Sequence, residues 1–302
     1  MKKHILVTGA TGMVGKALLQ SLHQKGYTIT VLSRKPTTVK NAKVYLWDVQ
    51  KQQIDLNCLT DVDTIIHLAG ASVAEKKWTK ARKKEIIDSR VQSTQLLYKS
   101  LKEHPNNVQN FISASAVGYY GDCGDEILTE ECPNGFGFLA ECCQLWENAV
   151  DEMKHLDLRV AKIRIGFVLG KSEGALPALE KPIRFFVGAP LGSGKQWIPW
   201  IHLHDLVNIF IAAIETPLMM GAYNASAPYP VTNETLTKAV AKQIHRPVWP
   251  IKVPEKILEL LLGEMSVVVA MSNNTSVQKL LGTGFQFDFV RLEDALDDIY
   301  HK

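Results

Sequence analysis

The 302-residue sequence has little of what marks several specialised protein classes. Its five cysteines, an odd number in a long chain, argue against a disulfide framework and favour a reducing compartment, so we expect a cytoplasmic protein. No apolar run approaches the roughly 18 residues of a membrane span, and we expect neither membrane association nor a signal peptide. Because 34 Lys and Arg face 31 Asp and Glu, the net charge of +3 gives no sign of a nucleic-acid partner.

What is present is the composition of a globular protein, with 46% hydrophobic and 22% charged residues. Short apolar runs alternate with segments of helical periodicity over the first 170 residues. The predicted strands are 5–7, 27–32, 44–47, 64–68, 108–115 and 158–169, and the main predicted helices are 14–22, 79–103 and 140–153. This alternation requires crossover helices on both faces of a parallel sheet. It predicts an α/β fold with a Rossmann-type doubly wound sheet.

The character of the chain changes after Gly170, where glycines and prolines crowd the sequence up to Pro199. We expect a NAD(P)-binding Rossmann domain over 1–170, with its sheet completed by segments around 198–226. Substrate-side loops and helices are expected over 171–249, and a small C-terminal helical domain over 250–302. No internal repeat interrupts this organisation.

Gly9, Gly12 and Gly15 lie three residues apart, between the first predicted strand and the first predicted helix. In such a turn, one glycine permits the tight bend, one lets the backbone approach a pyrophosphate, and one lets the helix pack closely on the strand. The spacing differs from the common G-x-G-x-x-G fingerprint, and an ordinary strand–helix turn is the alternative. The context favours dinucleotide binding.

The end of the second predicted strand indicates which dinucleotide binds. Ser33, Arg34 and Lys35 stand where an acidic residue would select NAD, and an arginine there can bind a 2′-phosphate, so NADP is favoured over NAD. A solvated pair of cations is the alternative. Asp48, at the end of the third predicted strand, either caps a turn or contacts the adenine side. Gly70 follows the fourth strand, where a small residue must admit the cofactor.

Several motifs together resemble a known family. Thr8–Gly15, Leu68–Gly70 and Ser115–Gly121 resemble the extended short-chain dehydrogenase/reductases, in the order and spacing of the NAD-dependent epimerase/dehydratase superfamily. The chain is most similar to its atypical YfcH-like epimerase subgroup. That similarity rests on Arg34, Trp78, Ser89-Arg90, Gly192-Ser193-Gly194 and Trp200-Ile201-His202. The tail from about residue 250 resembles that subgroup's C-terminal domain of unknown function.

The resemblance implies a Rossmann fold, NADP binding and a small-molecule substrate. Ser33, Arg34, Leu68, Ala69, Glu85 and Arg90 are the cofactor neighbours that it implies. With the glycine-rich turn and the second strand end, the candidate cofactor-binding residues are Gly9, Thr11, Gly12, Met13, Val14, Ser33, Arg34, Lys35, Leu68, Ala69, Gly70, Glu85 and Arg90. By analogy with the wider family, the protein is expected to be a monomer or a homodimer.

The resemblance also reveals a missing pair of residues. In the wider family a tyrosine, assisted by a lysine four residues later, exchanges a proton with the substrate, but the segment 137–144 contains neither residue. The family's Ser/Thr position falls on Ala116. Ser115, Tyr119 and Tyr120 are therefore the candidate catalytic residues, and the alternative is that both tyrosines pack a loop.

Two functions remain open at this point. One is an NADP-dependent oxidoreductase or epimerase that acts on a hydroxyl or carbonyl substrate, sugar nucleotides included, with non-standard catalytic residues. The other is an NADP-binding sensor or scaffold with little turnover. We expect no metal site, because the run His202-x-His204-Asp205 offers only three ligands and has no evident fourth. Lys195 and the glycines before it either hold an anionic substrate group or form a plain loop.

Overall fold

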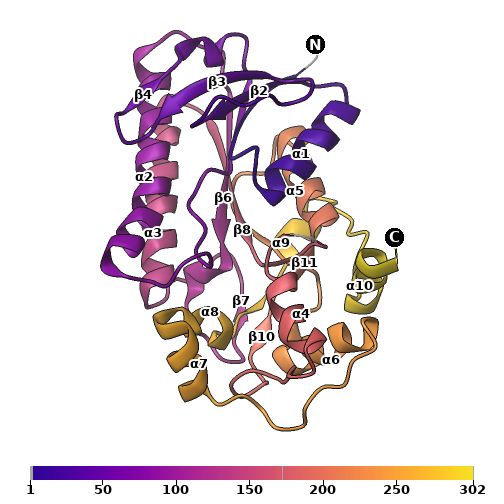
Figure 1. The fold of residues 1–302 in the computed structure, drawn as a ribbon. Helices are drawn as coiled ribbons and strands as arrows, with labels where there is room; N and C mark the ends of the chain where they lie inside the picture. Colours follow the sequence, from indigo (N-terminus) through magenta and orange to yellow (C-terminus); the bar gives the residue numbers. More distant parts are fainter. Residues whose placement is uncertain (1–2, 172, 302) are drawn as a thin grey trace.

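The computed structural model describes residues 3–171 and 173–301, and an eight-stranded sheet forms its centre (Figure 1). The strand order is β12-β8-β6-β5-β1-β2-β3-β4, and each neighbouring pair is parallel except β3 and β4. These strands are β1 (His4–Thr8), β2 (Thr28–Ser33), β3 (Lys43–Asp48), β4 (Gln53–Ile54), β5 (Thr64–His67), β6 (Asn110–Ala116), β8 (Arg159–Ile165) and β12 (Gly221–Ala225). The smaller strands are β7 (Ile127–Leu128), β9 (Phe167–Leu169), β10 (Trp197–Ile198), β11 (Trp200–His202), β13 (Val231–Thr232) and β14 (Asn274–Thr275). The expected α/β, Rossmann-type doubly wound fold is confirmed.

The chain winds outward from β1 in both directions, with helices on both faces of the sheet. Helices α1 and α5 cover one face, and α2 and α3 cover the other (Figure 1). The main helices are α1 (Met13–Gln24), α2 (Lys80–Glu103), α3 (Phe138–Asp151), α4 (Leu176–Arg184), α5 (Leu203–Glu215), α6 (Asn233–Gln243), α7 (Glu255–Leu262) and α10 (Leu292–His301). The connections that follow β1 and β5 leave toward opposite faces, and this opens a crevice at the carboxyl ends of these two strands.

Helix α2 has the predicted length, but the helical spacing of Ile87, Val91, Thr94, Tyr98 and Leu101 predicts its buried face only in part, since of these only Thr94 and Leu101 are buried. Ile87, Val91 and Tyr98 are only partly buried, whereas Ile86 and Ser93 are fully buried. The Ser93 hydroxyl donates to the carbonyl oxygen four residues earlier at 2.7 Å, and this satisfies its polar atom against the sheet. Small hydroxyl residues can therefore face the core, and a purely hydrophobic pattern does not reveal them.

The predicted strand 158–169 is two strands rather than one. β8 belongs to the central sheet, whereas β9 pairs with β11. The break falls at Gly166, where a Cβ atom would lie 2.0 Å from the carbonyl oxygen of Pro199. The prediction of one continuous strand is wrong because this close backbone approach leaves no trace in the apolar pattern.

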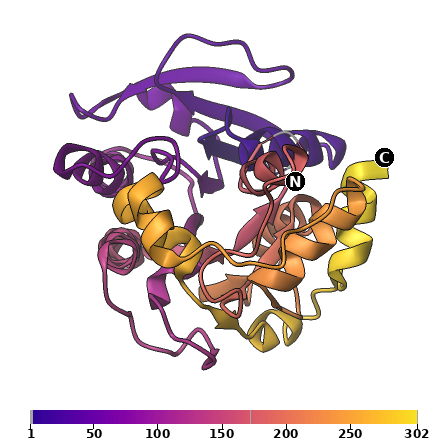
Figure 2. The same ribbon diagram turned by 60° about the horizontal axis from the view of Figure 1, so that its bottom comes forward.

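Residues beyond Gly170 build a second, smaller core beside the sheet. Trp200 is fully buried at its centre, and α4, α6 and α10 enclose it. The segments η4 (Gly263–Ser266) and α8 (Val267–Ala270) follow α7 and lie beside the starts of α2 and α3, as Figure 2 shows. The remaining short helices are η1 (Leu56–Leu59), η2 (Val117–Tyr120), η3 (Glu152–Leu156) and α9 (Gln278–Leu281). This region also returns to the central sheet, because β12 is an edge strand paired with β8.

Candidate functional site

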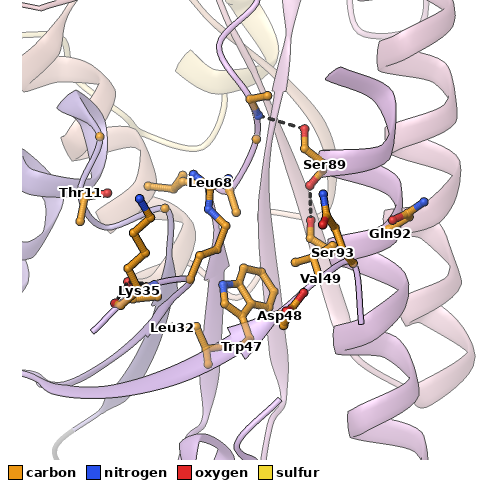
Figure 3. A pocket seen from close by; sticks show the side chains of 18 of the residues that line it. Thr11, Leu32, Lys35, Trp47, Asp48, Val49, Leu68, Ser89, Gln92 and Ser93 are labelled. Carbon is orange, nitrogen blue, oxygen red and sulfur yellow. Dashed lines mark hydrogen bonds between the residues drawn. The ribbon is translucent and has the colours of Figure 1, made fainter. Parts of the chain in front are cut away.

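A cleft of about 990 Å³ opens at the carboxyl ends of the central strands, where the strand order reverses. Figure 3 shows side chains that reach it from the turn before α1, from the ends of β2 and β3, and from α2. The lining residues are Gly9, Ala10, Thr11, Gly12, Val31, Leu32, Ser33, Arg34, Lys35, Pro36, Thr37, Trp47, Asp48, Val49, Gln50, Leu68, Ala69, Gly70, Ala71, Ala81, Lys84, Glu85, Asp88, Ser89, Gln92 and Ser93.

Three glycines shape the turn between β1 and α1, each for a different reason. Gly9 has a φ of +69°, and a Cβ atom there would lie 2.7 Å from the carbonyl carbon of Leu68. A Cβ atom at Gly15 would lie 2.4 Å from the Gly9 carbonyl oxygen. Gly12 has an ordinary φ of −77°, and its Cβ atom would meet its nearest neighbour at 3.5 Å. Packing within the protein therefore requires glycine at positions 9 and 15 but not at position 12.

The N-terminus of α1 is open at this turn. Gly12 is the N-cap residue, no side chain in the described part of the chain caps the helix, and its first turn has no acidic residue. The first N–H groups of a helix lack partners within the helix and carry the positive end of its dipole. Because Gly9 to Gly12 line the cleft, these donors suit a phosphate group.

Two cations and no carboxylate follow β2. The Ser33 hydroxyl donates to the Lys35 carbonyl oxygen at 2.7 Å and holds this turn. Arg34 and Lys35 are exposed, line the cleft, and form no side-chain hydrogen bond or ion pair with another described residue. Asp48 accepts the Lys51 N–H at 3.0 Å, so it caps a turn, and it also lines the cleft.

Most of the predicted cofactor-binding residues meet in this cleft. The structure brings together Gly9, Thr11, Gly12, Ser33, Arg34, Lys35, Leu68, Ala69, Gly70 and Glu85. Three others are not on its lining: Met13 lies against Gly170, Val14 packs partly against the core, and Arg90 lies behind Gly70. The Arg90 guanidinium donates to the Ala71 carbonyl oxygen at 3.0 Å and stacks 5.1 Å from the Trp146 ring.

Sequence reasoning missed the wall that α2 contributes. Lys84, Asp88, Ser89, Gln92 and Ser93 all line the cleft from one side of this helix. Their helical spacing was the available signal, but polar residues at this spacing are usually solvated. The cluster Lys80, Arg82, Lys83 and Lys84 predicts a solvated face of α2, but this is wrong for Arg82, whose guanidinium is buried and donates to the Ser72 carbonyl oxygen at 2.5 Å.

A buried histidine supports the floor of the cleft. Thr8 Oγ1 lies 2.8 Å from His67 Nδ1, and Ser93 Oγ lies 3.1 Å from His67 Nε2. Because Thr8 Oγ1 accepts backbone N–H groups from Leu68 and Ala69, its proton goes to Nδ1, and Nε2–H of the neutral ring then donates to Ser93. Burial, with a smaller contribution from the Arg90 charge, lowers the pKa of His67 to about 3.

Two of the three predicted catalytic hydroxyls lie in a buried polar network. Ser115 donates to Glu147 Oε1 at 2.7 Å, and Tyr120 donates to Asn224 Oδ1 at 2.7 Å. Arg164 joins them, because it forms two hydrogen bonds with the Glu147 carboxylate, at 2.8 and 3.0 Å, and donates to the Tyr120 hydroxyl at 2.9 Å. None of the three, Ser115, Tyr119 and Tyr120, lines either of the two cavities described here.

Charges within this network hold its groups in fixed protonation states. Burial would raise the pKa of Glu147, but the hydrogen bonds and charges of Arg164 and Lys162 outweigh it and keep that pKa below its usual value. Burial raises the pKa of Tyr120 to about 12, although Arg164 opposes the shift. Tyr119 is only half-buried, and its ring lies 3.6 Å from the Arg164 guanidinium carbon. Tyr119 is therefore the more accessible of the two tyrosines.

Helix α3, in which the resemblance to the wider family implies a proton-transfer pair, contains neither tyrosine nor lysine. Leu139 faces Gly118, where a Cβ atom would lie 3.3 Å from the Leu139 Cβ. Cys142 and Cys143 are buried, and burial raises the pKa of both thiols, as expected for residues that pack in the core. Glu141 is exposed in the first turn.

A second cavity, of about 500 Å³, lies between the start of α3, the segment before α2, and the C-terminal region. It is lined by Trp78, Lys83, Phe136, Gly137, Phe138, Leu139, Glu259, Gly263, Glu264, Ser266, Val267 and Met271. Ala71, on the wall of the first cleft, packs in one cluster with Phe138 and Leu139 of the second. The linings of the two cavities thus share one hydrophobic cluster, formed around Trp78, Ile86 and Cys142.

The remaining sequence candidates have structural partners. The N–H groups of Gly192, Gly194 and Lys195 all donate within the protein, which leaves few donors for an anion in that loop. The Asp205 carboxylate accepts two backbone N–H groups, at 2.9 and 3.0 Å. Over the residues that the structure describes, no group of His, Cys, Asp and Glu is placed to hold a metal ion. Likewise, none of the described helices is long and apolar enough to cross a membrane.

The fold and the cleft define a dinucleotide-binding α/β protein of the short-chain dehydrogenase/reductase type. The model of the NAD dependent epimerase/dehydratase family matches residues 5–226, and a model of a domain of unknown function, DUF1731, matches residues 253–299. The chain belongs to the NAD-dependent epimerase/dehydratase family, and the expected C-terminal domain of unknown function is present.

Relatives resemble the chain over nearly all its length. An epimerase family protein of Staphylococcus saprophyticus is 36% identical over 302 residues, which cover 99% of this chain and all of the relative. A chloroplastic homologue of epimerase family protein SDR39U1 from Arabidopsis thaliana is 35% identical, with 97% of this chain and 85% of the relative covered.

Solved structures give the same result. The human epimerase family protein SDR39U1 (isoform 2), solved with NADPH, matches with a TM-score of 0.87 and 28% identity over 99% of both chains. A UDP-glucuronic acid 4-epimerase of Bacillus cereus, solved with UDP-glucuronic acid and NAD, matches with a TM-score of 0.79 and 18% identity over 99% of this chain and 98% of the other. This second match shows a shared fold alone.

The glycine geometry predicts that two alanine substitutions lower the stability by different amounts. Gly15→Ala should lower the free energy of unfolding by about 1–3 kcal/mol, because its methyl group overpacks the turn. Gly12→Ala should cost no more than about 1 kcal/mol, the usual penalty of alanine at an N-cap. Urea unfolding of the two variants measures this difference, and equal losses would contradict the packing described here.

His67 predicts a pH dependence of stability. The unfolded chain binds a proton at a pKa near 6.5 and the folded chain only near 3, so stability is fully present above pH 6.5 and is lost as the pH falls toward 3. Between pH 6 and 4 the loss should reach about 1.4 kcal/mol per pH unit. Urea unfolding of wild type and His67→Gln isolates this contribution, because other titrating groups are common to both. Parallel pH profiles would contradict it.

Proposed function

We propose that the protein binds NADP in the 990 Å³ cleft and is an oxidoreductase or epimerase with non-standard catalytic residues. The observation that carries the proposal is the combination of an open helix N-terminus with two free cations at the end of β2. The residues present fit the cofactor, because Gly12 leaves room for a close backbone approach and no carboxylate follows β2.

Each part of the cleft has a role in holding the cofactor. The N–H groups at Gly12 and the start of α1 would bind the pyrophosphate. Arg34, and Lys35 beside it, would bind the 2′-phosphate that distinguishes NADP from NAD. Leu68 to Ala71 would lie along the nicotinamide side, with Gly70 small enough to leave the Arg90 guanidinium close behind it. When bound, the cofactor supplies or accepts a hydride.

Proton transfer cannot follow the family's usual route, since α3 contains neither tyrosine nor lysine. Tyr119 is the candidate donor that the structure leaves most accessible, and its ring lies 3.6 Å from the Arg164 guanidinium carbon. Tyr120 and Ser115 instead hold Arg164 and Glu147 in place. Their roles in this proposal are positional.

A catalytically weak NADP-binding sensor is the second candidate function. The buried network favours it, because the hydroxyls of Ser115 and Tyr120 are already committed to partners within the protein. In such a protein, cofactor binding would stabilise the first cleft without a reaction following.

Substitution of Arg34 tests the cofactor assignment. Arg34→Ala should weaken NADPH binding by about 1.5–3 kcal/mol, the value of hydrogen bonds to a charged group, and should leave NADH binding almost unchanged. Titration calorimetry measures both affinities. Gly12→Ala is the matched control, because crowding of the pyrophosphate should weaken both cofactors alike. Equal losses of affinity for NADPH and NADH in Arg34→Ala would contradict the assignment of NADP.

Turnover distinguishes the enzyme from the sensor. NADPH oxidation over a panel of aldehydes, ketones and sugar nucleotides should detect activity, and Tyr119→Phe should lower kcat by about 10²-fold or more if it donates the proton. Tyr120→Phe is the control, since it removes a hydroxyl that is buried and already donates to Asn224. Tight NADPH binding without oxidation of any compound would favour the sensor instead.

A further inference from the structure

The side chains that line the second cavity suit the binding of an apolar ring. Trp78 and Phe138 pack edge to face with their centroids 4.7 Å apart. The Trp78 indole N–H donates to the Val73 carbonyl oxygen at 2.8 Å, which fixes the orientation of its ring. Leu139 and Met271 add apolar surface to the same lining. Flat aromatic ligands stack on such walls.

The charges of this cavity are unsuited to an anion. Lys83 is the one cation among its lining residues, and it is paired with Glu264. Glu259 supplies a second carboxylate, so the lining carries a net negative charge. A diphosphate needs unpaired cations or clustered N–H donors, and this lining would repel it.

The same residues disfavour a cationic ligand. The Lys83 ammonium lies 5.2 Å from the centre of the Phe138 ring and 6.0 Å from that of Trp78. It therefore already occupies the place beside the rings and the Glu264 carboxylate that a ligand ammonium would take. A ligand ammonium beside the rings would have to displace Lys83, whereas a neutral group would not.

We propose that the second cavity binds the ring of a neutral aromatic carbonyl compound and not a sugar nucleotide. This inference rests on the proposed function, since a carbonyl carbon is the group on which hydride chemistry acts. Ala71 of the cofactor cleft and Phe138 and Leu139 of the second cavity pack against one buried cluster, so such a ring would lie on the same hydrophobic cluster as a wall of the cofactor cleft. The volume of about 500 Å³ accommodates two or three fused rings.

Two neighbouring valines provide a matched pair of variants. Val267 lines the cavity, whereas Val268, on the same short helix, does not. Both side chains are partly exposed, at 45% and 36%, so a larger residue is tolerated at each. Val267→Trp should fill the cavity, and Val268→Trp should leave it open.

The experiment titrates 2-acetylnaphthalene into the NADPH-loaded protein and follows binding by saturation-transfer NMR and calorimetry. We expect binding to wild type and Val268→Trp, at least tenfold weaker binding to Val267→Trp, and equal melting temperatures and NADPH affinities in all three. UDP-glucose and phenyltrimethylammonium should not displace the probe.

The outcomes separate this inference from the proposed function. NADPH binding without probe binding, or equal probe binding to the two tryptophan variants, would overturn the cavity assignment and leave the cofactor site intact. Displacement of the probe by UDP-glucose or by phenyltrimethylammonium would overturn it in favour of an anionic or a cationic ligand. Binding of the probe by a protein that binds no NADPH would support the cavity and contradict the proposed function.

Discussion

The hydroxyl of Thr8 joins the ends of the two central strands. It accepts the N–H groups of Leu68 and Ala69 at 3.1 and 3.2 Å and bonds to His67 at 2.8 Å. With β1 and β5 held in this way, the backbone of Gly9 can lie against Leu68, and α1 can begin where the cleft opens. The cleft depends on this contact because backbone atoms form its floor, and a backbone cannot adjust by a change of side-chain rotamer.

Buried charged side chains hold the other part of the site, where two of the predicted catalytic hydroxyls lie. Arg164 on β8 and Glu147 on α3 form a buried pair that takes up the hydroxyls of Ser115 and Tyr120. Such a pair is costly to desolvate and stabilises the fold only when its hydrogen bonds are complete, as they are here. The network fixes α3 against β6 and β8. The cleft is retained, while α3 contains neither the tyrosine nor the lysine of the wider family.

The sequence was most informative where function constrains the backbone. The glycine spacing and Arg34 predicted where the first cleft would lie, because strand ends and turns have strong local signals. The fates of Ser115 and Tyr120 could not be predicted, since their partners Glu147 and Asn224 are distant in sequence. The second cavity could not be predicted either, because Trp78, Phe138 and Val267 come to line one cavity only once the C-terminal region has folded.

The path of the chain also settles how independent the C-terminal region can be. β12 leaves that region to pair with residues 161–165 of β8, and its Asn224 accepts a hydrogen bond from the Tyr120 hydroxyl. A chain cut near residue 170 would leave backbone N–H and C=O groups of β8 unpaired along this edge, and such an edge can pair with strands of other chains. Residues that follow the nucleotide-binding half in the chain thus cover the edge of its sheet. A nascent chain exposes that edge, and can associate through it, until those residues have been synthesised.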